Sequence, residues 1–160
     1  MAAHDPSLRW PIAASNLTRV GDSLLAKRRG TNEPHHGIDL YAPAGTQVLS
    51  ASDGVVLRVV DGSAGRKTSL KRAGLYIDIA DDVGRVHRYL HLGSALVGAN
   101  QVVRRGNRIG TVAATGGGSG VNHSRPHLHY EIRLWDYRDG KYGIPEDPLA
   151  LLGPIFPARS

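Results

Sequence analysis

The chain of 160 residues contains no cysteine. This absence excludes disulfide bonds, cysteine nucleophiles and thiolate metal ligands, so any transition-metal site would have to use histidine and carboxylate side chains. The chain also lacks a run of about 18 apolar residues, which excludes a membrane-spanning helix. What is present, 41% apolar and 21% charged residues, is the composition of an ordinary globular protein. The length predicts about one domain.

Positive charge is in excess, with a formal net charge of +6 and a pI near 10.0. This balance favours a polyanionic partner. Nucleic acid, anionic lipid and an anionic cell wall all qualify, and charge alone does not choose among them. Because the chain has no motif of interleaved basic and aromatic residues, we do not expect nucleic acid as the partner.

Short apolar or alternating runs recur along the chain, punctuated by 20 Gly and 9 Pro residues. This pattern predicts a mainly β fold without a long helix. The turn at 81–84 predicts an antiparallel strand pair, and the Asp-Gly pairs at 53–54 and 61–62 predict further hairpin turns. A short helical turn is expected at 147–152. The predicted strands are residues 46–51, 54–60, 75–80, 86–92, 108–113 and 127–134.

Two segments, 44–48 and 105–109, resemble each other. In each, a glycine is followed by two polar residues and then by a β-branched residue that opens a predicted strand. The similarity is compatible with a duplicated β unit.

Eight histidines are many for a chain of this size. Two of them, His127 and His129, lie two residues apart in a predicted strand. Since side chains alternate across a strand, both rings should project from one face, with Leu128, Tyr130 and Ile132 pointing into the core. Such a pair suits metal binding or acid–base chemistry, although a His-x-His pair taken alone is more often incidental.

His35 and Asp39 form a second pair. Pro34 and Gly37 argue against a helix here, and in an extended segment the even spacing puts both side chains on one face. A histidine nitrogen and a carboxylate oxygen bind zinc at about 2.0–2.2 Å. Taken alone, the two residues are better explained as an ion pair.

His91 lies in a third predicted strand. Alternation places His87, Tyr89 and His91 on one face of it, with Leu90 and Leu92 on the other. A histidine on the polar face of a half-buried strand is more often structural than catalytic, so the role of His91 depends on its neighbours.

Together these side chains supply the parts of a hydrolytic zinc site. Such a site takes three protein ligands and leaves one position open. One aspartate and two histidines would leave a net charge of +1 on the site, and zinc lowers the pKa of water toward about 7. Histidines outside the ligand set can then move protons and stabilise an oxyanion.

The order of the motifs is similar to that of the LytM/lysostaphin family of zinc endopeptidases. The motifs are HxxxD at 35–39 with the following LYAPAGT, YLHL at 89–92, and HLHYE at 127–131. The likeness covers roughly residues 20–151. It implies an antiparallel β-sheet with an open groove and hydrolysis of peptide bonds in peptidoglycan stem peptides or cross-links.

The resemblance also implies roles for individual residues. It implies one zinc ion per chain and catalysis by His91 and His127. The implied zinc ligands are His35, Asp39 and His129. Small residues usually precede the HLH motif in this family, whereas here Ser124, Arg125 and Pro126 do. Arg125 either narrows the groove or meets a substrate carboxylate. We assign it, with Tyr89, to substrate binding.

Two other protein classes remain open. The first is a catalytically inactive relative that binds cell wall or activates another wall hydrolase; such relatives lose metal ligands, whereas this chain keeps the full set. The second is a biotinyl or lipoyl carrier domain, which needs a lysine at a hairpin tip, and the Asp-Gly pair at 53–54 has none nearby.

We divide the chain into an N-terminal extension (1–19), a LytM-type domain (20–152) and a C-terminal tail (153–160). Peptidoglycan as the substrate implies a periplasmic or extracellular location. Residues 1–9 lack the apolar core of a signal peptide. Either a leader has been removed, or a phage-like particle or secretion system delivers the protein. We expect a monomer.

Overall fold

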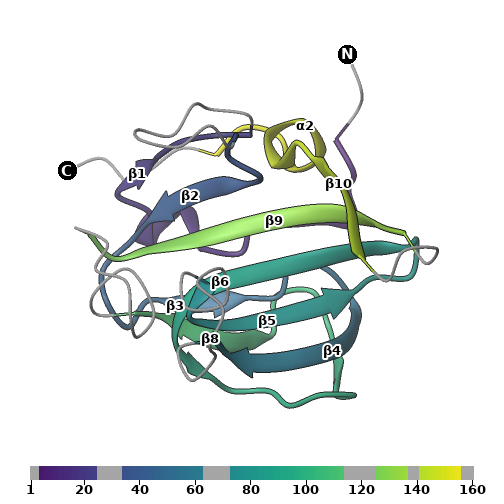
Figure 1. Ribbon diagram of the computed structural model, residues 1–160. Helices are drawn as coiled ribbons and strands as arrows, with labels where there is room; N and C mark the ends of the chain where they lie inside the picture. Colours follow the sequence, from purple (N-terminus) through teal and green to yellow (C-terminus); the bar gives the residue numbers. More distant parts are fainter. Residues whose placement is uncertain (1–3, 25–33, 63–72, 114–124, 137–140, 156–160) are drawn as a thin grey trace.

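The computed structural model describes residues 4–24, 34–62, 73–113, 125–136 and 141–155. Its strands are joined in one antiparallel sheet, which confirms the predicted mainly β fold (Figure 1). The path through the sheet is β1-β2-β9-β6-β5-β4-β7; β10 pairs with β9, and β8 pairs with β3 and β6. The elements are η1 (Ala14–Asn16), β1 (Arg19–Val20), β2 (Ile38–Tyr41), β3 (Gln47–Leu49), β4 (Gly54–Asp61), β5 (Leu75–Ala80), β6 (Arg85–Ala95), β7 (Val102–Val103), β8 (Arg108–Val112), β9 (His127–Asp136), β10 (Lys141–Glu146) and α2 (Pro148–Leu152).

Each of the six predicted strands is present, with ends that differ by a few residues. The antiparallel pair around the turn at 81–84 is confirmed as β5 and β6, and the helical turn near the C-terminus is α2. The Asp-Gly pair at 53–54 is not a hairpin turn, because β3 and β4 pair with other strands. The pair at 61–62 begins a connection between β4 and β5 that is far longer than two residues.

The two similar segments occupy equivalent positions. Gly45 and Gly106 both adopt positive φ, at 81° and 89°, in turns that lead into β3 and β8. Glycine adopts this conformation without the steric cost of a Cβ. The two strands pair with each other, and the hydrogen bonds around them repeat: the Gly45 N–H donates to Val112 and the Gly106 N–H donates to Ser50. The structure therefore contains the duplicated β unit that the sequence indicated.

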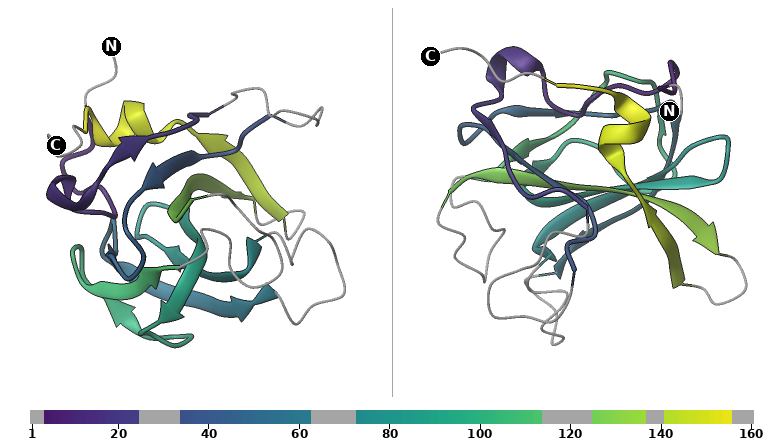
Figure 2. Two further views of the ribbon diagram at one scale, coloured as in Figure 1. Left: turned by 90° about the vertical axis from the view of Figure 1, so that its left-hand side faces the viewer. Right: turned by 90° about the horizontal axis from the view of Figure 1, so that it is seen from above.

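Strand β9 runs through the centre of the molecule, between β2 and β6 (Figure 1). The sheet is strongly curved, so its strands wrap around the core (Figure 2). The N-terminal segment also contributes to this core, since Ile12 and Leu17 are buried in it. The Asp5 N–H donates to Leu151 and the Arg9 N–H donates to Ala51, which ties the segment to α2 and to the connection between β3 and β4. In the described part of the chain, no helix has the length and apolarity needed to span a membrane.

Candidate metal centre

Strands β2 and β9 place the central residues side by side. Their register pairs Asp39 with His129 and Tyr41 with His127. Directly opposed residues in an antiparallel pair point to the same face, so Asp39 and the two histidines share one face of the sheet. Leu128 points to the opposite face and is fully buried, as alternation predicted.

Three potential ligand atoms converge on this face. Asp39 Oδ1 lies 2.9 Å from His129 Nδ1 and 3.2 Å from His35 Nε2, and the two nitrogens are 3.1 Å apart. His35 reaches the group from the segment just before β2. Both histidines are buried, and 13% of the Asp39 side chain is exposed. The structure therefore brings together the three residues for which the sequence predicted a common site.

The second nitrogen of each histidine is held by an acceptor. His35 Nδ1 lies 3.1 Å from the carbonyl oxygen of Ser23, and His129 Nε2 lies 2.8 Å from Oε1 of Glu131. These partners assign the ring hydrogens to the outward nitrogens. In the neutral rings, His35 Nε2 and His129 Nδ1 therefore present lone pairs to the Asp39 carboxylate, and three acceptors face one another.

Acceptors this close require a cation between them, either a proton or a metal ion. Zinc binds histidine nitrogen at about 2.0–2.1 Å, and tetrahedral ligands at that distance are about 3.3 Å apart. The observed separations of 2.9–3.2 Å are close to this value. Two histidines and one carboxylate are also a donor set found in catalytic zinc sites. The group therefore fits a metal ion.

The pKa values show how strongly the site attracts a positive charge. Burial alone would raise the pKa of Asp39, but hydrogen bonds to His129 and His35 hold that pKa well below its usual range. Burial alone would lower the pKa of His129, but Asp39 and Glu131 raise it to about 9. A proton on His129 and a metal ion at its Nδ1 are thus competing ways to neutralise the same group of acceptors.

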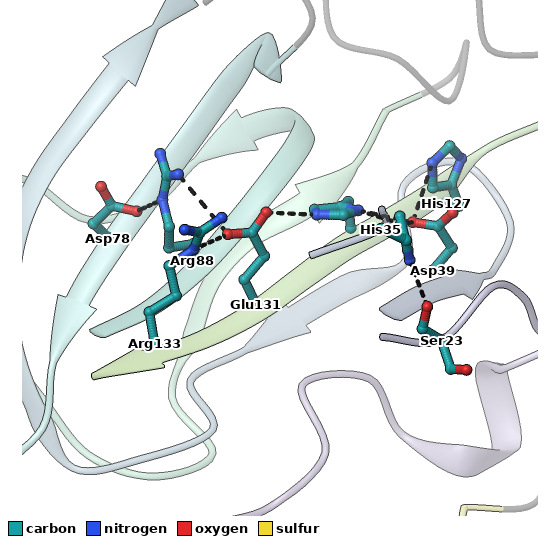
Figure 3. Close-up of polar contacts among 9 residues, drawn as sticks. Ser23, His35, Asp39, Asp78, Arg88, His127, Glu131 and Arg133 are labelled. Atoms are coloured by element: carbon teal, nitrogen blue, oxygen red, sulfur yellow. Dashed lines mark hydrogen bonds and ion pairs between the residues drawn. The ribbon is translucent and has the colours of Figure 1, made fainter. Parts of the chain in front are cut away.

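Glu131 is the residue that the sequence analysis missed. It is buried, and besides His129 it accepts a hydrogen bond of 2.6 Å from Arg133 Nε at its second oxygen. Arg88 lies 3.9 Å from the same oxygen and donates to Asp78 at 2.9 Å (Figure 3). Carboxylates of this kind orient metal-binding histidines and raise their basicity. The signal was its position two residues after His129, on the same face of β9.

His127 is held in an orientation that suits proton transfer. Its Nδ1 lies 2.9 Å from the carbonyl oxygen of Arg125 and donates to it. Nε2 then carries the lone pair of the neutral ring, at 3.9 Å from Asp39 Oδ1. The side chain is 6% exposed, so the imidazole is buried beside Asp39 and largely excluded from solvent.

His91 reaches the site through an irregularity in β6. Its φ is +66°, which is unusual for a residue other than glycine, and the register of β6 against β8 shifts next to it. Its ring centre lies 5.1 Å from that of His127 and 5.8 Å from that of His129. The positive φ of His91 breaks the alternation of β6. Leu90 is paired with His129 and His91 contacts both His127 and His129, so two successive side chains face the site, while Leu92 packs in the main core.

The prediction that His91 shares a face with His87 and Tyr89 is therefore wrong. Tyr89 pairs with Tyr130 on the core side of the sheet, and its hydroxyl accepts a hydrogen bond of 2.9 Å from the Ala51 N–H. It has no exposed surface, so its position contradicts the assignment of Tyr89 to substrate binding. Arg125, by contrast, is exposed two residues before the start of β9.

A profile of Peptidase family M23 matches residues 33–143 of the sequence. The chain belongs to this family. The matched residues include His35, Asp39 and His129. The match confirms the LytM/lysostaphin resemblance inferred from the motifs.

Individual M23 proteins support the same conclusion. The peptidoglycan DD-endopeptidase ShyB of Vibrio cholerae is 39% identical over 128 residues, which cover 78% of this chain and 27% of that protein. A crystal structure of a zinc-containing peptidase from Vibrio cholerae has a TM-score of 0.69 at 26% identity, over 94% of this chain and 41% of that one. The catalytic domain of lysostaphin from Staphylococcus simulans, at 23% identity, has the same fold with a TM-score of 0.65, over 82% of this chain and 90% of that one. The chain spans about a quarter of the length of the curated relatives that it matches.

Proposed function

We propose that this M23 domain is a zinc-dependent endopeptidase that cuts peptide bonds in peptidoglycan stem peptides or cross-links. The observation that carries the proposal is the convergence of three acceptor atoms beside two further buried histidines. The names of relatives such as ShyB support the substrate class. Peptidoglycan as the substrate places the enzyme in the periplasm or outside the cell.

The ligands of the zinc ion would be His35, Asp39 and His129. When bound, zinc acts as a Lewis acid toward the amide carbonyl and makes a hydrolytic nucleophile available at neutral pH. Once His129 has given up its proton, the site would offer a divalent cation one carboxylate and the lone pairs of two imidazole rings.

His127 carries out the proton transfers. Because its Nδ1 donates to the Arg125 carbonyl, the neutral ring has its lone pair on Nε2, which accepts the proton of the attacking water and passes it to the leaving amine. His91, whose ring lies edge-on to His127, stabilises the negative charge that develops on the carbonyl oxygen. The left-handed backbone of His91 is what brings this second imidazole to the site.

Mass spectrometry of digested cell walls tests the proposal. Zinc-loaded protein should release shortened stem peptides or opened cross-links from Gram-negative or Gram-positive walls. The sugar chains should show no new reducing ends, because the described carboxylates of the site, Asp39 and Glu131, are both bound to histidines and do not form the catalytic carboxylic-acid pair of a glycosidase. Intact peptides in both walls, with about one zinc per chain, would instead identify a catalytically inactive wall-binding domain.

A further inference from the structure

We propose that Arg19 and Arg125 form a carboxylate-binding subsite next to the catalytic histidines, which selects peptides with a free carboxylate near the cleaved bond. The inference rests on the proposed function, because it specifies the substrate of the same site. It is carried by the strand register, by a pocket and by the charges around that pocket.

The register of three adjacent strands sets the position of this subsite. Arg19 pairs with Tyr41, and Tyr41 pairs with His127, so the three side chains form a row across one face of β1, β2 and β9. The neighbouring row on that face holds Asp39 and His129. Since strands lie about 4.8 Å apart, Arg19 is roughly 10 Å from His127 along the row.

A pocket of about 230 Å³ opens over this row. Tyr41, which lines the pocket, contacts His127, with the two ring centres 5.1 Å apart. The pocket is smaller than typical sites for drug-sized ligands, so it suits one side chain or one chain end. Its lining includes Tyr41, Ala42, Pro43, Pro126, Arg19 and Arg125.

Two positive charges stand at this otherwise mostly apolar pocket. The Arg19 guanidinium lies over the Tyr41 ring, 5.1 Å from its centre, and this cation–π contact holds it in place. Both arginines are exposed, and within the part of the chain that the structure describes, neither has a carboxylate within 4.0 Å.

Guanidinium groups favour planar carboxylates, to which they donate paired hydrogen bonds. An extended peptide advances about 3.3 Å per residue, so the distance from His127 corresponds to a carboxylate within about three residues of the cleaved bond. Either a C-terminal carboxylate or an acidic side chain of the stem peptide meets this condition.

The test uses zinc-loaded protein and three matched stem peptides. One keeps both its C-terminal and its side-chain carboxylate, and each of the others has one of the two converted to an amide. Amidation of the recognised carboxylate should lower kcat/KM about tenfold, chiefly through KM, because a charge-assisted hydrogen-bonded pair is lost. The peptide that shows this loss identifies the source of the carboxylate.

The double variant Arg19→Gln/Arg125→Gln should reduce this discrimination to nearly onefold. Arg104→Gln is the matched control, since Arg104 is 77% exposed and belongs to another part of the surface, and it should keep the full discrimination. Equal cleavage of all three peptides by the unmodified enzyme would overturn the subsite and leave the proposed function standing. Discrimination that survives in the double variant would also overturn it.

Failure to cleave any peptide would contradict the proposed function and not the subsite. In that case, calorimetric binding of the same three peptides tests the subsite alone. The free carboxylate should then bind about tenfold more tightly than its amide, and only while both arginines are present. Equal binding of all three would overturn the subsite.

Discussion

Two buried histidines on opposite faces of the sheet, His87 and His129, have similar surroundings and different chemistry. Each has a carboxylate against its Nε2: Asp81 lies 2.9 Å from that of His87, and Glu131 lies 2.8 Å from that of His129. Each also has a close partner at Nδ1. The partner of His87 is the Tyr130 hydroxyl at 2.7 Å, whereas the partner of His129 is the Asp39 carboxylate at 2.9 Å.

The difference lies in the balance of donors and acceptors. A neutral His87 donates to Asp81 and accepts from the Tyr130 O–H, so both ring nitrogens are satisfied without an added proton or metal ion. At His129 both partners are carboxylates, and His35 adds a third acceptor. Buried acceptors without a donor are costly, so this network needs a cation. One network is closed and structural, and the other is open and able to bind metal.

The largest expected contrast is in zinc content. His129→Ala or Asp39→Ala should lose most of the zinc and with it the activity, because only two protein ligands remain. His87→Ala, the matched change on the other face, should keep about one zinc per folded chain. Elemental analysis of purified protein measures this. Loss of zinc in the His87 variant would show that the two networks are not independent.

The next contrast separates metal ligands from catalytic residues on the face of the sheet that carries His129. His127→Ala and His91→Ala should retain zinc and lose about 10²–10⁴-fold in kcat, since an acid–base group or an oxyanion partner is removed. Steady-state kinetics together with metal analysis checks both properties. His4→Ala serves as the control, since His4 packs against Gly153 outside the site. Normal turnover by the His91 variant would show that His91 takes no part in catalysis.

Zinc affinity should depend on Glu131. Glu131→Gln keeps the shape of the side chain and removes its charge, so zinc should bind about 10–100-fold more weakly. Competition with a chelator gives the affinity without any assay of activity. Asp82→Asn, which removes an exposed carboxylate, should leave the affinity unchanged. An unaltered affinity in the Glu131 variant would mean that the buried carboxylate serves folding only.

Zinc affinity should also depend on pH. With the pKa of His129 raised to about 9, zinc must displace a proton at lower pH, so affinity should fall about tenfold per pH unit below that value. Because the folded pKa is raised, the protonated ring stabilises the metal-free fold fully below about pH 6.5, and this contribution is lost as the pH rises through about 9. Chelator titrations and thermal unfolding between these pH values test both statements. A pH-independent affinity would contradict the first.

The smallest effect is expected for the His87 network on the opposite face of the sheet. Tyr130→Phe removes the hydroxyl that donates to His87 and leaves its Nδ1 unsatisfied, which should cost about 1 kcal/mol of unfolding free energy. Urea denaturation measures the loss, and zinc affinity should not change. A fall in zinc affinity comparable to that of Glu131→Gln would break the distinction between the two faces.

Much of the site follows from local sequence rules. Alternation predicted that His127 and His129 share one face of a strand, and that His35 and Asp39 share one face of an extended segment. The family resemblance implied that three of these residues bind one zinc ion, and the register of β2 against β9 brings those three together. Four strands escaped prediction for identifiable reasons. β1 and β7 have two residues each, β10 contains a proline, and β2 was recognised only as an extended segment.

Alternation failed where the backbone left the regular strand conformation. The sequence gives no sign that His91 adopts a positive φ, because that conformation is imposed by its neighbours and not by its own preference. For the same reason Tyr89, predicted to lie beside His91, is found in the core.

The sequence by itself determined the type of fold and the set of candidate ligand side chains, because periodicity and side-chain donors are local properties. Only the tertiary structure decided which acceptor holds the outward nitrogen of each ring, and so which nitrogen of His35 and of His129 faces the Asp39 carboxylate. It also decided that Arg19 stands in one row with Tyr41 and His127. These relations join residues that are distant in the chain, and they depend on strand register, which is fixed when the whole sheet packs around its core.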